Sequence, residues 1–290
     1  MSEETAYRAL SEPTDDVRWA FGTGFADPLS DVDAVAPDDV EGADLAAYCL
    51  MLGDDALVMS HRLQEWVTRA PELEVETALA NVGLDLLGQA RLLLTRAGHL
   101  DGTGRTEDDY AFGRQISEFR NVQFVEGADS DFARLVVRLL VFATWRLAMF
   151  DRLRESCDPM LAAIAEKSVK ELTYHRDYAA QWVVHLGDGT TLSHERAQAA
   201  VDTVEPFVGE LFEPSEVERR LAAANVATDP SLLRGEVDAV LHDVLITATL
   251  HRPAHISGKR AGRDGSHSAA MATLLSELQS LARAHPGATW

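Results

Sequence analysis

Three side chains in the middle of the chain have the types and spacing that metal binding requires. Glu171 and His175 are four residues apart, so on a helix both would lie on one face. Asp85 falls in an earlier apolar stretch of similar length. Carboxylates and imidazoles presented in this way are ligands for metal ions in helical proteins. Further candidate ligands lie earlier in the chain: Asp54, Asp55 and Glu65.

Other histidine pairs carry weaker signals. His61 and Glu65 are also four residues apart, but pairing on a helix surface explains this spacing as well as metal ligation does. His251 and His255 flank Pro253, which breaks the helix that a two-histidine motif needs. Neither pair therefore adds a strong candidate.

The remaining polar motifs favour structural roles. Residues 262–267 read GRDGSH, but they follow no predicted strand and lack the lysine of a phosphate-binding loop. We interpret them as a turn, with contact to a partner as a hypothesis. Arg91 and Arg176 are basic candidates for contact with a substrate, but surface salt bridges explain both. No nucleotide-binding fingerprint, cysteine cluster or serine-hydrolase elbow is present.

Apolar residues recur every three or four positions over most of the chain, which predicts helices. Pro71 is expected as the first residue of the second helix, with Gly98 as its end, and Asp158-Pro159 separates the third helix from the fourth. No segment alternates as a strand does. The four long helices are expected at about 44–70, 71–98, 130–157 and 159–187, and shorter ones at about 107–119, 193–212, 216–224, 231–250 and 269–284.

Two tight helical hairpins joined by one long crossover are typical of a ferritin-like four-helix bundle. We therefore predict an all-α ferritin-like domain over residues 44–290, with additional peripheral C-terminal helices. Residues 1–43 are rich in proline, glycine and acidic residues and lack an apolar period, which indicates a mostly irregular extension.

Such bundles hold two metal ions with a Glu-x-x-His pair on each of two helices and a further Glu on each of the others. In this sequence the inward stripe of the second helix passes through Leu86 and Gln89, and that of the fourth passes through Leu172 and His175. Only His175 can bind a metal ion among these four degenerate ligand positions. We predict that this chain has no metal, cofactor-binding or catalytic residues of its own, and that His175 is a core histidine bonded to a carboxylate or the backbone.

We also predict the surroundings of three further residues in the expected helices. Arg146 is in register with the inward face of the third helix. We hypothesise that it forms an ion pair with Asp55 or Asp85. Cys49 and Cys157 both lie in apolar helical stretches, so we expect two small buried hydrophobes rather than a disulfide.

The charge and the apolar pattern exclude several classes of partner. The formal net charge is −21, which argues against nucleic acid and anionic membranes as partners. Only 3 of the 26 basic residues are lysines, which suggests either a salt-adapted source or an arginine-rich genome. No signal peptide or 20-residue apolar run is evident, so we expect a soluble, cytoplasmic protein.

The sequence also resembles a known family, the C subunits of the multicomponent phenylacetyl-CoA epoxidase (ring 1,2-phenylacetyl-CoA oxygenase). The similarity extends from Asp44 to Trp290, and residues 1–43 have no counterpart. Its most specific parts are the stretch from Pro71 to Gly98 and the predicted fourth helix. The resembling stretches are LGDDALVMSHRLQEW, APELEVETALANVGLDLLGQARLLLTRAG, EDDYAF, EFRNVQFVE, DFARLVVR, DPMLAAIAEKSVKELTYHRDYAAQWVVHLGDGT, GRDGSHS and HPGATW.

This resemblance implies a protein that lacks iron and supports a homologous catalytic A subunit with a di-iron centre. It also implies a small bridging B subunit and a reductase with FAD, an iron–sulfur cluster and NADPH. The complex would epoxidise the aromatic ring of phenylacetyl-CoA with O2 in phenylacetate catabolism. One alternative stays open from the residues themselves, namely an active di-iron oxidase that uses Asp85, Glu171 and His175.

Overall fold

The computed structural model describes residue 29 and residues 32–254 and 262–286. The chain divides into two compact units, Met1–Val32 and Asp33–Trp290. In the first unit the amide of Val32 donates to the carbonyl oxygen of Leu29 at 3.0 Å. The described residues of the second unit form helices and loops without a β-strand, which confirms the all-α prediction.

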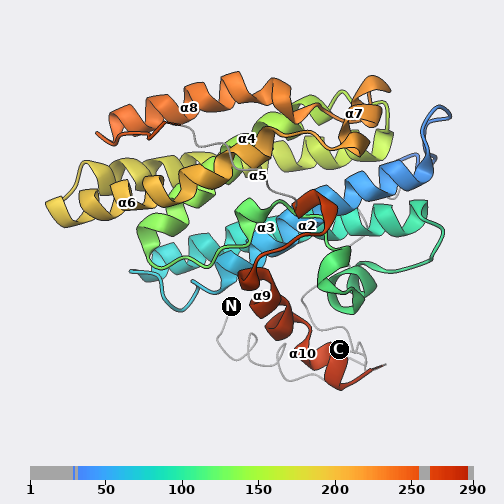
Figure 1. Ribbon diagram of the computed structural model, residues 1–290, viewed down its shortest axis with the longest axis horizontal. Coiled ribbons are helices and arrows are strands. Elements are labelled where there is room, and N and C mark those ends of the chain that lie inside the picture. The colour runs from blue at the N-terminus through green and yellow to red at the C-terminus, as the bar shows by residue number, and fades with distance from the viewer. Residues whose placement is uncertain (1–28, 30–31, 255–261, 287–290) are drawn as a thin grey trace, which may run out of the picture. The chain divides into compact units, whose positions relative to one another are not determined.

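Four long helices form the centre of the second unit. They are α2 (Gly42–Gln64), α3 (Leu73–Leu100), α4 (Phe132–Leu153) and α5 (Pro159–Gly187). Helix α2 packs along α3 and α4 packs along α5, while α3 and α5 are also in contact (Figure 1). Apolar side chains of all four helices are fully buried, so the two pairs share one core.

Shorter helices cover the long ones. Helices α6 (Thr191–Val208) and α8 (Arg234–Thr247) contact α4 and α5, and α7 (Glu216–Ala223) contacts α2 (Figure 1). Helices α9 (Ala269–Leu278) and α10 (Ser280–Ala284) contact the chain that links α3 to α4. No helix in the described part of the chain has both the length and the apolar character that a membrane span requires.

The helix boundaries follow local chemistry and in places differ from the sequence-based expectation. Asp158 accepts a hydrogen bond from the amide of Leu161 at 2.8 Å, and Pro159 follows as the first residue of α5. Helix α2 ends at Gln64 instead of near residue 70, because the chain tightens there into turns. Helix α3 begins at Leu73, so Pro71 lies before it instead of opening it.

Gly98 does not end α3, contrary to the sequence-based prediction, because the helix continues to Leu100. A Cβ atom at residue 98 would lie only 2.1 Å from the carbonyl oxygen of Arg105. The glycine is therefore needed for close approach of the following chain and not for helix termination.

The link between α3 and α4, residues 101–131, is here called the connector. The single α-helix expected at about 107–119 does not form. In its place are one π-helical turn at Asp109–Gly113 and 3-10 turns at Ile116–Glu118 and Gln123–Val125. Residues 119–126 of this irregular chain are mostly buried, so their polar groups require hydrogen-bond partners from neighbouring elements.

Candidate functional site

The predicted ligand residues meet where α3 passes α5. His175 Nε2 lies 3.0 Å from Asp85 Oδ2, and Gln89 Nε2 donates to Glu171 Oε2 at 3.1 Å. On each helix the two residues are four positions apart, so the two contacts lie one helical turn from each other. Each of these two contacts is here called a rung. We call these four residues the α3–α5 seam. The predicted hydrogen bond between His175 and a carboxylate is present, and the imidazole is buried.

Arg146 reaches the seam from α4. Its Nε donates to Gln89 Oε1 at 2.9 Å and its Nη1 donates to the carbonyl oxygen of Leu52 on α2 at 3.2 Å. The side chain is fully buried, and its guanidinium lies 4.3 Å from the ring centroid of Phe150. This one residue therefore links three of the four long helices.

The guanidinium of Arg146 carries its charge inside the protein. Burial lowers its pKa to about 10, while the charge of Asp55 acts in the opposite direction. A pKa near that value keeps the group positive at neutral pH. The expected pairing with Asp55 or Asp85 is wrong in its detail, since the hydrogen-bond partner is Gln89 and Asp55 acts only through its charge.

The centre does not fit the two-metal site that the bundle pattern expects. Leu86 and Leu172 have no exposed surface, and a leucine has no lone pair to donate. The side chain of Gln89 is engaged by Arg146 and Glu171. Within residues 32–254 and 262–286, no three His, Cys, Asp or Glu side chains are grouped so that they could hold a metal ion.

The two candidate acids of α2 point to the connector instead of the seam. Asp54 forms a two-pronged ion pair with Arg114 and accepts the amide of Arg120 at 2.8 Å. Asp55 accepts the amide of Val122 at 2.9 Å and pairs through both oxygens with Arg263, at 3.0 and 2.8 Å. These buried carboxylates supply the partners that the irregular backbone of the connector needs.

Arg263 belongs to residues 262–286, here called the C-terminal segment. Besides its ion pair with Asp55, its Nη1 donates to the carbonyl oxygens of Met51 and Arg120 at 3.0 and 2.8 Å. Burial acts to lower the pKa of Arg263, but the charges of Asp55, Glu218 and Glu210 and the hydrogen bond to Asp55 together raise it. The preceding Gly262 is packed so closely that a Cβ atom would lie 2.3 Å from the carbonyl oxygen of Asn121.

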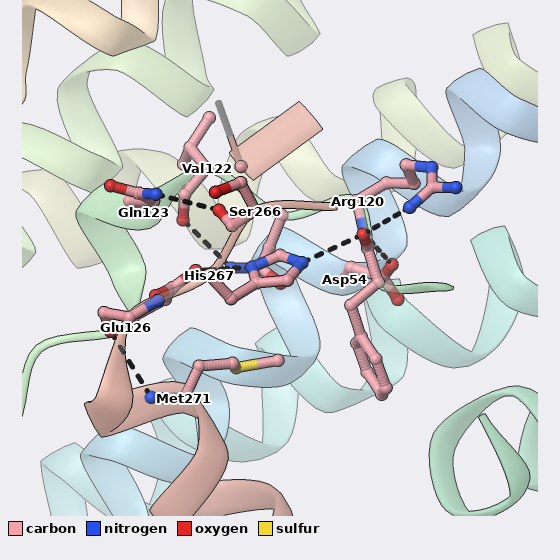
Figure 2. A network of polar contacts seen from close by, with 12 residues as sticks. Asp54, Arg120, Val122, Gln123, Glu126, Ser266, His267 and Met271 are labelled. Atoms are coloured by element: carbon pink, nitrogen blue, oxygen red, sulfur yellow. Dashed lines mark hydrogen bonds and ion pairs between the residues drawn. The ribbon is translucent and has the colours of Figure 1, made fainter. Parts of the chain in front are cut away.

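A second set of polar contacts holds the same segment (Figure 2). His267 lies between Glu126 and Phe119, with Nδ1 2.7 Å from the carboxylate and Nε2 3.1 Å from the carbonyl oxygen. The amide of Ser268 donates to Glu126 at 2.7 Å, and Gln123 donates to the carbonyl oxygen of Ser266 at 2.8 Å. The GRDGSH motif is thus a turn that contacts this chain itself.

Sequence reasoning missed the roles of Glu126 and Arg263. Both lie in short motifs outside the α-helices, where periodicity says nothing about which way a side chain points. The available signal was weak, namely an acidic residue and an arginine inside otherwise apolar or glycine-rich stretches.

None of the weaker sequence candidates that the structure describes forms a contact of the seam. Glu65 pairs with Arg62 and not with His61. His251 is exposed, and His255 lies outside the described residues. Arg91 forms a salt bridge with Glu107, and Arg176 forms one with Asp177. Salt bridges of this kind are what the sequence led us to expect for both arginines.

The cysteines differ from one another. Cys49 is buried in α2, as predicted, and burial raises the pKa of its thiol. Cys157 is exposed, contrary to expectation, because α4 ends at Leu153 and leaves Cys157 in the turn before α5.

Comparison with known proteins adds to this geometry. Residues 32–290 match the family model described as phenylacetic acid catabolic protein. The chain is 42% identical over 246 residues to the C subunit of the 1,2-phenylacetyl-CoA epoxidase of Escherichia coli strain K12. That alignment covers 85% of this chain and 99% of the relative.

Proposed function

The chain belongs to the phenylacetic acid catabolic protein family, and on this basis we propose that it is the structural, non-catalytic member of a phenylacetyl-CoA epoxidase complex. In this proposal it acts in phenylacetate catabolism. The observation that carries it is the 42% identity to an epoxidase C subunit across 99% of that relative's length. The family match over residues 32–290 includes all four long helices.

The proposed fold is a ferritin-like four-helix bundle. The pairing of α2 with α3 and of α4 with α5, with the connector between the pairs, supports this assignment. Helices α6 to α10 are then the peripheral additions.

The proposed role is support of a partner and not chemistry. At the four positions that the metal pattern requires, the chain has two buried leucines, a glutamine engaged by Arg146, and one histidine. Leucine in place of a buried ligand carboxylate also removes a charge that is costly to bury without a metal ion. These substitutions favour a stable core over a reactive one.

The proposed partner is a homologous catalytic subunit with the di-iron centre. A chain that keeps the helices of the catalytic subunit but not its metal site could pair with it in a pseudo-symmetric interface. Obligate interfaces of this type bury roughly 2,000 Å² or more. A small bridging subunit and a reductase with FAD, an iron–sulfur cluster and NADPH complete the proposed complex.

A second candidate is an active di-iron oxidase that uses Asp85, Glu171 and His175. The observation in its favour is that the seam brings these three residues into two adjacent rungs. The buried hydrocarbon of Leu86 and Leu172 and the guanidinium of Arg146 oppose it. Iron bound to the isolated chain would distinguish the two candidates.

Reconstitution with the homologous catalytic subunit of the same organism tests the proposal. We expect the two purified chains to form one defined complex in size-exclusion chromatography with light scattering. With the bridging subunit and the reductase added, the complex should consume O2 with phenylacetyl-CoA, and omission of this chain should abolish that activity. The proposal fails if the chains elute separately, or if this chain alone oxidises phenylacetyl-CoA.

A further inference from the structure

The central cation of this protein is an arginine side chain. Gln89 occupies the position at which the metal-ligand pattern expects a histidine, and its Oε1 accepts the Nε hydrogen of Arg146 at 2.9 Å. A metal ion held by a side chain at residue 89 would have to lie next to that side chain, on its inward side. The guanidinium of Arg146 already lies there.

We propose that the guanidinium of Arg146 takes the place of a metal ion in the core of this chain and prevents one from binding. This inference rests on the proposed function, because it assumes a chain that works without its own metal. It assigns to one residue a role that the leucines alone do not fulfil, since leucines remove ligands but supply no positive charge.

The charges around Arg146 support this assignment. Asp55 interacts electrostatically with the guanidinium from α2, and the seam contributes the carboxylate of Glu171 through Gln89. Asp55 has its own ion-pair partner in Arg263, and the partly exposed Glu171 pairs with Lys167 at 3.0 Å. In a metalloprotein a metal ion adds positive charge at this centre, whereas here the guanidinium of Arg146 adds it.

Without Arg146, the seam would be close to a metal site. Its two rungs place Asp85 beside His175 and residue 89 beside Glu171, at 3.0 and 3.1 Å. A histidine at residue 89 would therefore create a set of two imidazoles and two carboxylates. Zn²⁺ and Co²⁺ bind such sets.

The test compares Q89H, which retains Arg146, with Q89H/R146M, in which an unbranched apolar side chain replaces the arginine. Each variant is incubated with Co²⁺ and passed through a desalting column, and cobalt per chain is measured by plasma mass spectrometry. We expect about one Co²⁺ per chain in Q89H/R146M, with visible d–d absorption bands, and under about a tenth in Q89H. Bound Co²⁺ should also raise the melting temperature of the double variant only.

The matched control is Q89H/R138M, which loses another buried arginine of α4 but keeps Arg146. It should bind as little cobalt as Q89H does. Equal binding by Q89H and Q89H/R146M overturns the proposal, and so does binding by neither. A double variant that folds only with Co²⁺ present supports it, whereas one that stays unfolded with Co²⁺ counts against it.

Failure of this inference can be distinguished from failure of the proposed function. If the unmodified chain contains a full complement of metal, the proposed function fails before any variant is made. If the unmodified chain is free of metal and Q89H binds Co²⁺ with Arg146 in place, only the inference about Arg146 fails.

Discussion

At the scale of single residues, buried charges are placed with specific partners. Arg146 bonds Gln89 and a backbone carbonyl, and Arg96 contacts Asp158 at 2.5 Å where α5 begins. A buried charge without a partner would cost several kcal/mol, so each of these contacts constrains which residue types the position tolerates. The same logic makes the titration of a buried group visible in the stability of the protein.

His61 gives a prediction of this kind. Burial, with a smaller contribution from the charge of Arg62, lowers the pKa of His61 from its ordinary value of 6.5. A lowered pKa favours the neutral form in the folded state, so this contribution to stability is present above about pH 6.5 and is lost as the pH falls through the folded-state pKa. The melting temperature of H61Q should therefore fall less than that of the unmodified chain between about pH 7.5 and pH 5.

The control is H242Q, which alters an exposed histidine of α8. Its melting temperature should follow that of the unmodified chain over the same pH range. Identical pH profiles for H61Q, H242Q and the unmodified chain would show that His61 does not titrate as described.

The orientation of a single side chain was predictable from the sequence only where the residue lies on a helix with a clear apolar period. Leu86, Leu172 and His175 lie on inward stripes, and all three are buried. The period also brings Arg146 inward, but it does not identify the side chain that a long arginine reaches. That partner depends on how α3 and α4 are placed against each other, which no local pattern records.

At the scale of elements, the connector and the C-terminal segment depend on each other. The connector has little regular hydrogen bonding of its own, and buried acids of α2 accept hydrogen bonds from two of its amides. The C-terminal segment covers it through Arg263 and through His267, which Figure 2 shows. We infer that these two elements unfold together, because each supplies polar partners to the other.

Replacement of Arg263 tests this coupling. R263M leaves the carboxylate of Asp55 buried without its ion-pair partner, which should cost about 3–5 kcal/mol in the free energy of unfolding. Chemical denaturation measures the loss. Hydrogen exchange should show faster exchange in both the connector and residues 262–286.

Arg220 provides the control, because it also pairs through two nitrogens with one aspartate, Asp44, but at the surface. R220M should cost under about 1 kcal/mol. Equal losses for R263M and R220M, or faster exchange confined to one of the two elements, would contradict the coupling.

The elements themselves were partly predictable. Asp158-Pro159 separates α4 from α5 because a capping carboxylate and a proline act locally. Gly98 had a local interpretation that proved wrong, because its role is set by contact with Arg105, seven residues further along the chain. The irregular connector was predicted as a helix, since its hydrogen-bond partners lie on α2 and in the C-terminal segment, far away in the sequence.

At the scale of the whole molecule, the four long helices share a core held together by apolar packing and by buried polar contacts, among them those of the Arg146 guanidinium. The family relationship and the similarity to an epoxidase C subunit give these helices their proposed role as a support for a catalytic partner. A support of this kind must fold without metal, and its fold must not depend on a cofactor supplied by the partner.

The most direct measurement of this claim is the iron and zinc content of the unmodified chain, purified alone and analysed by plasma mass spectrometry. We predict under about a tenth of a metal atom per chain, with no change in melting temperature after treatment with a chelator. One to two atoms per chain that survive the chelator would contradict the claim. In that case Asp85, Glu171 and His175 would hold a working metal site.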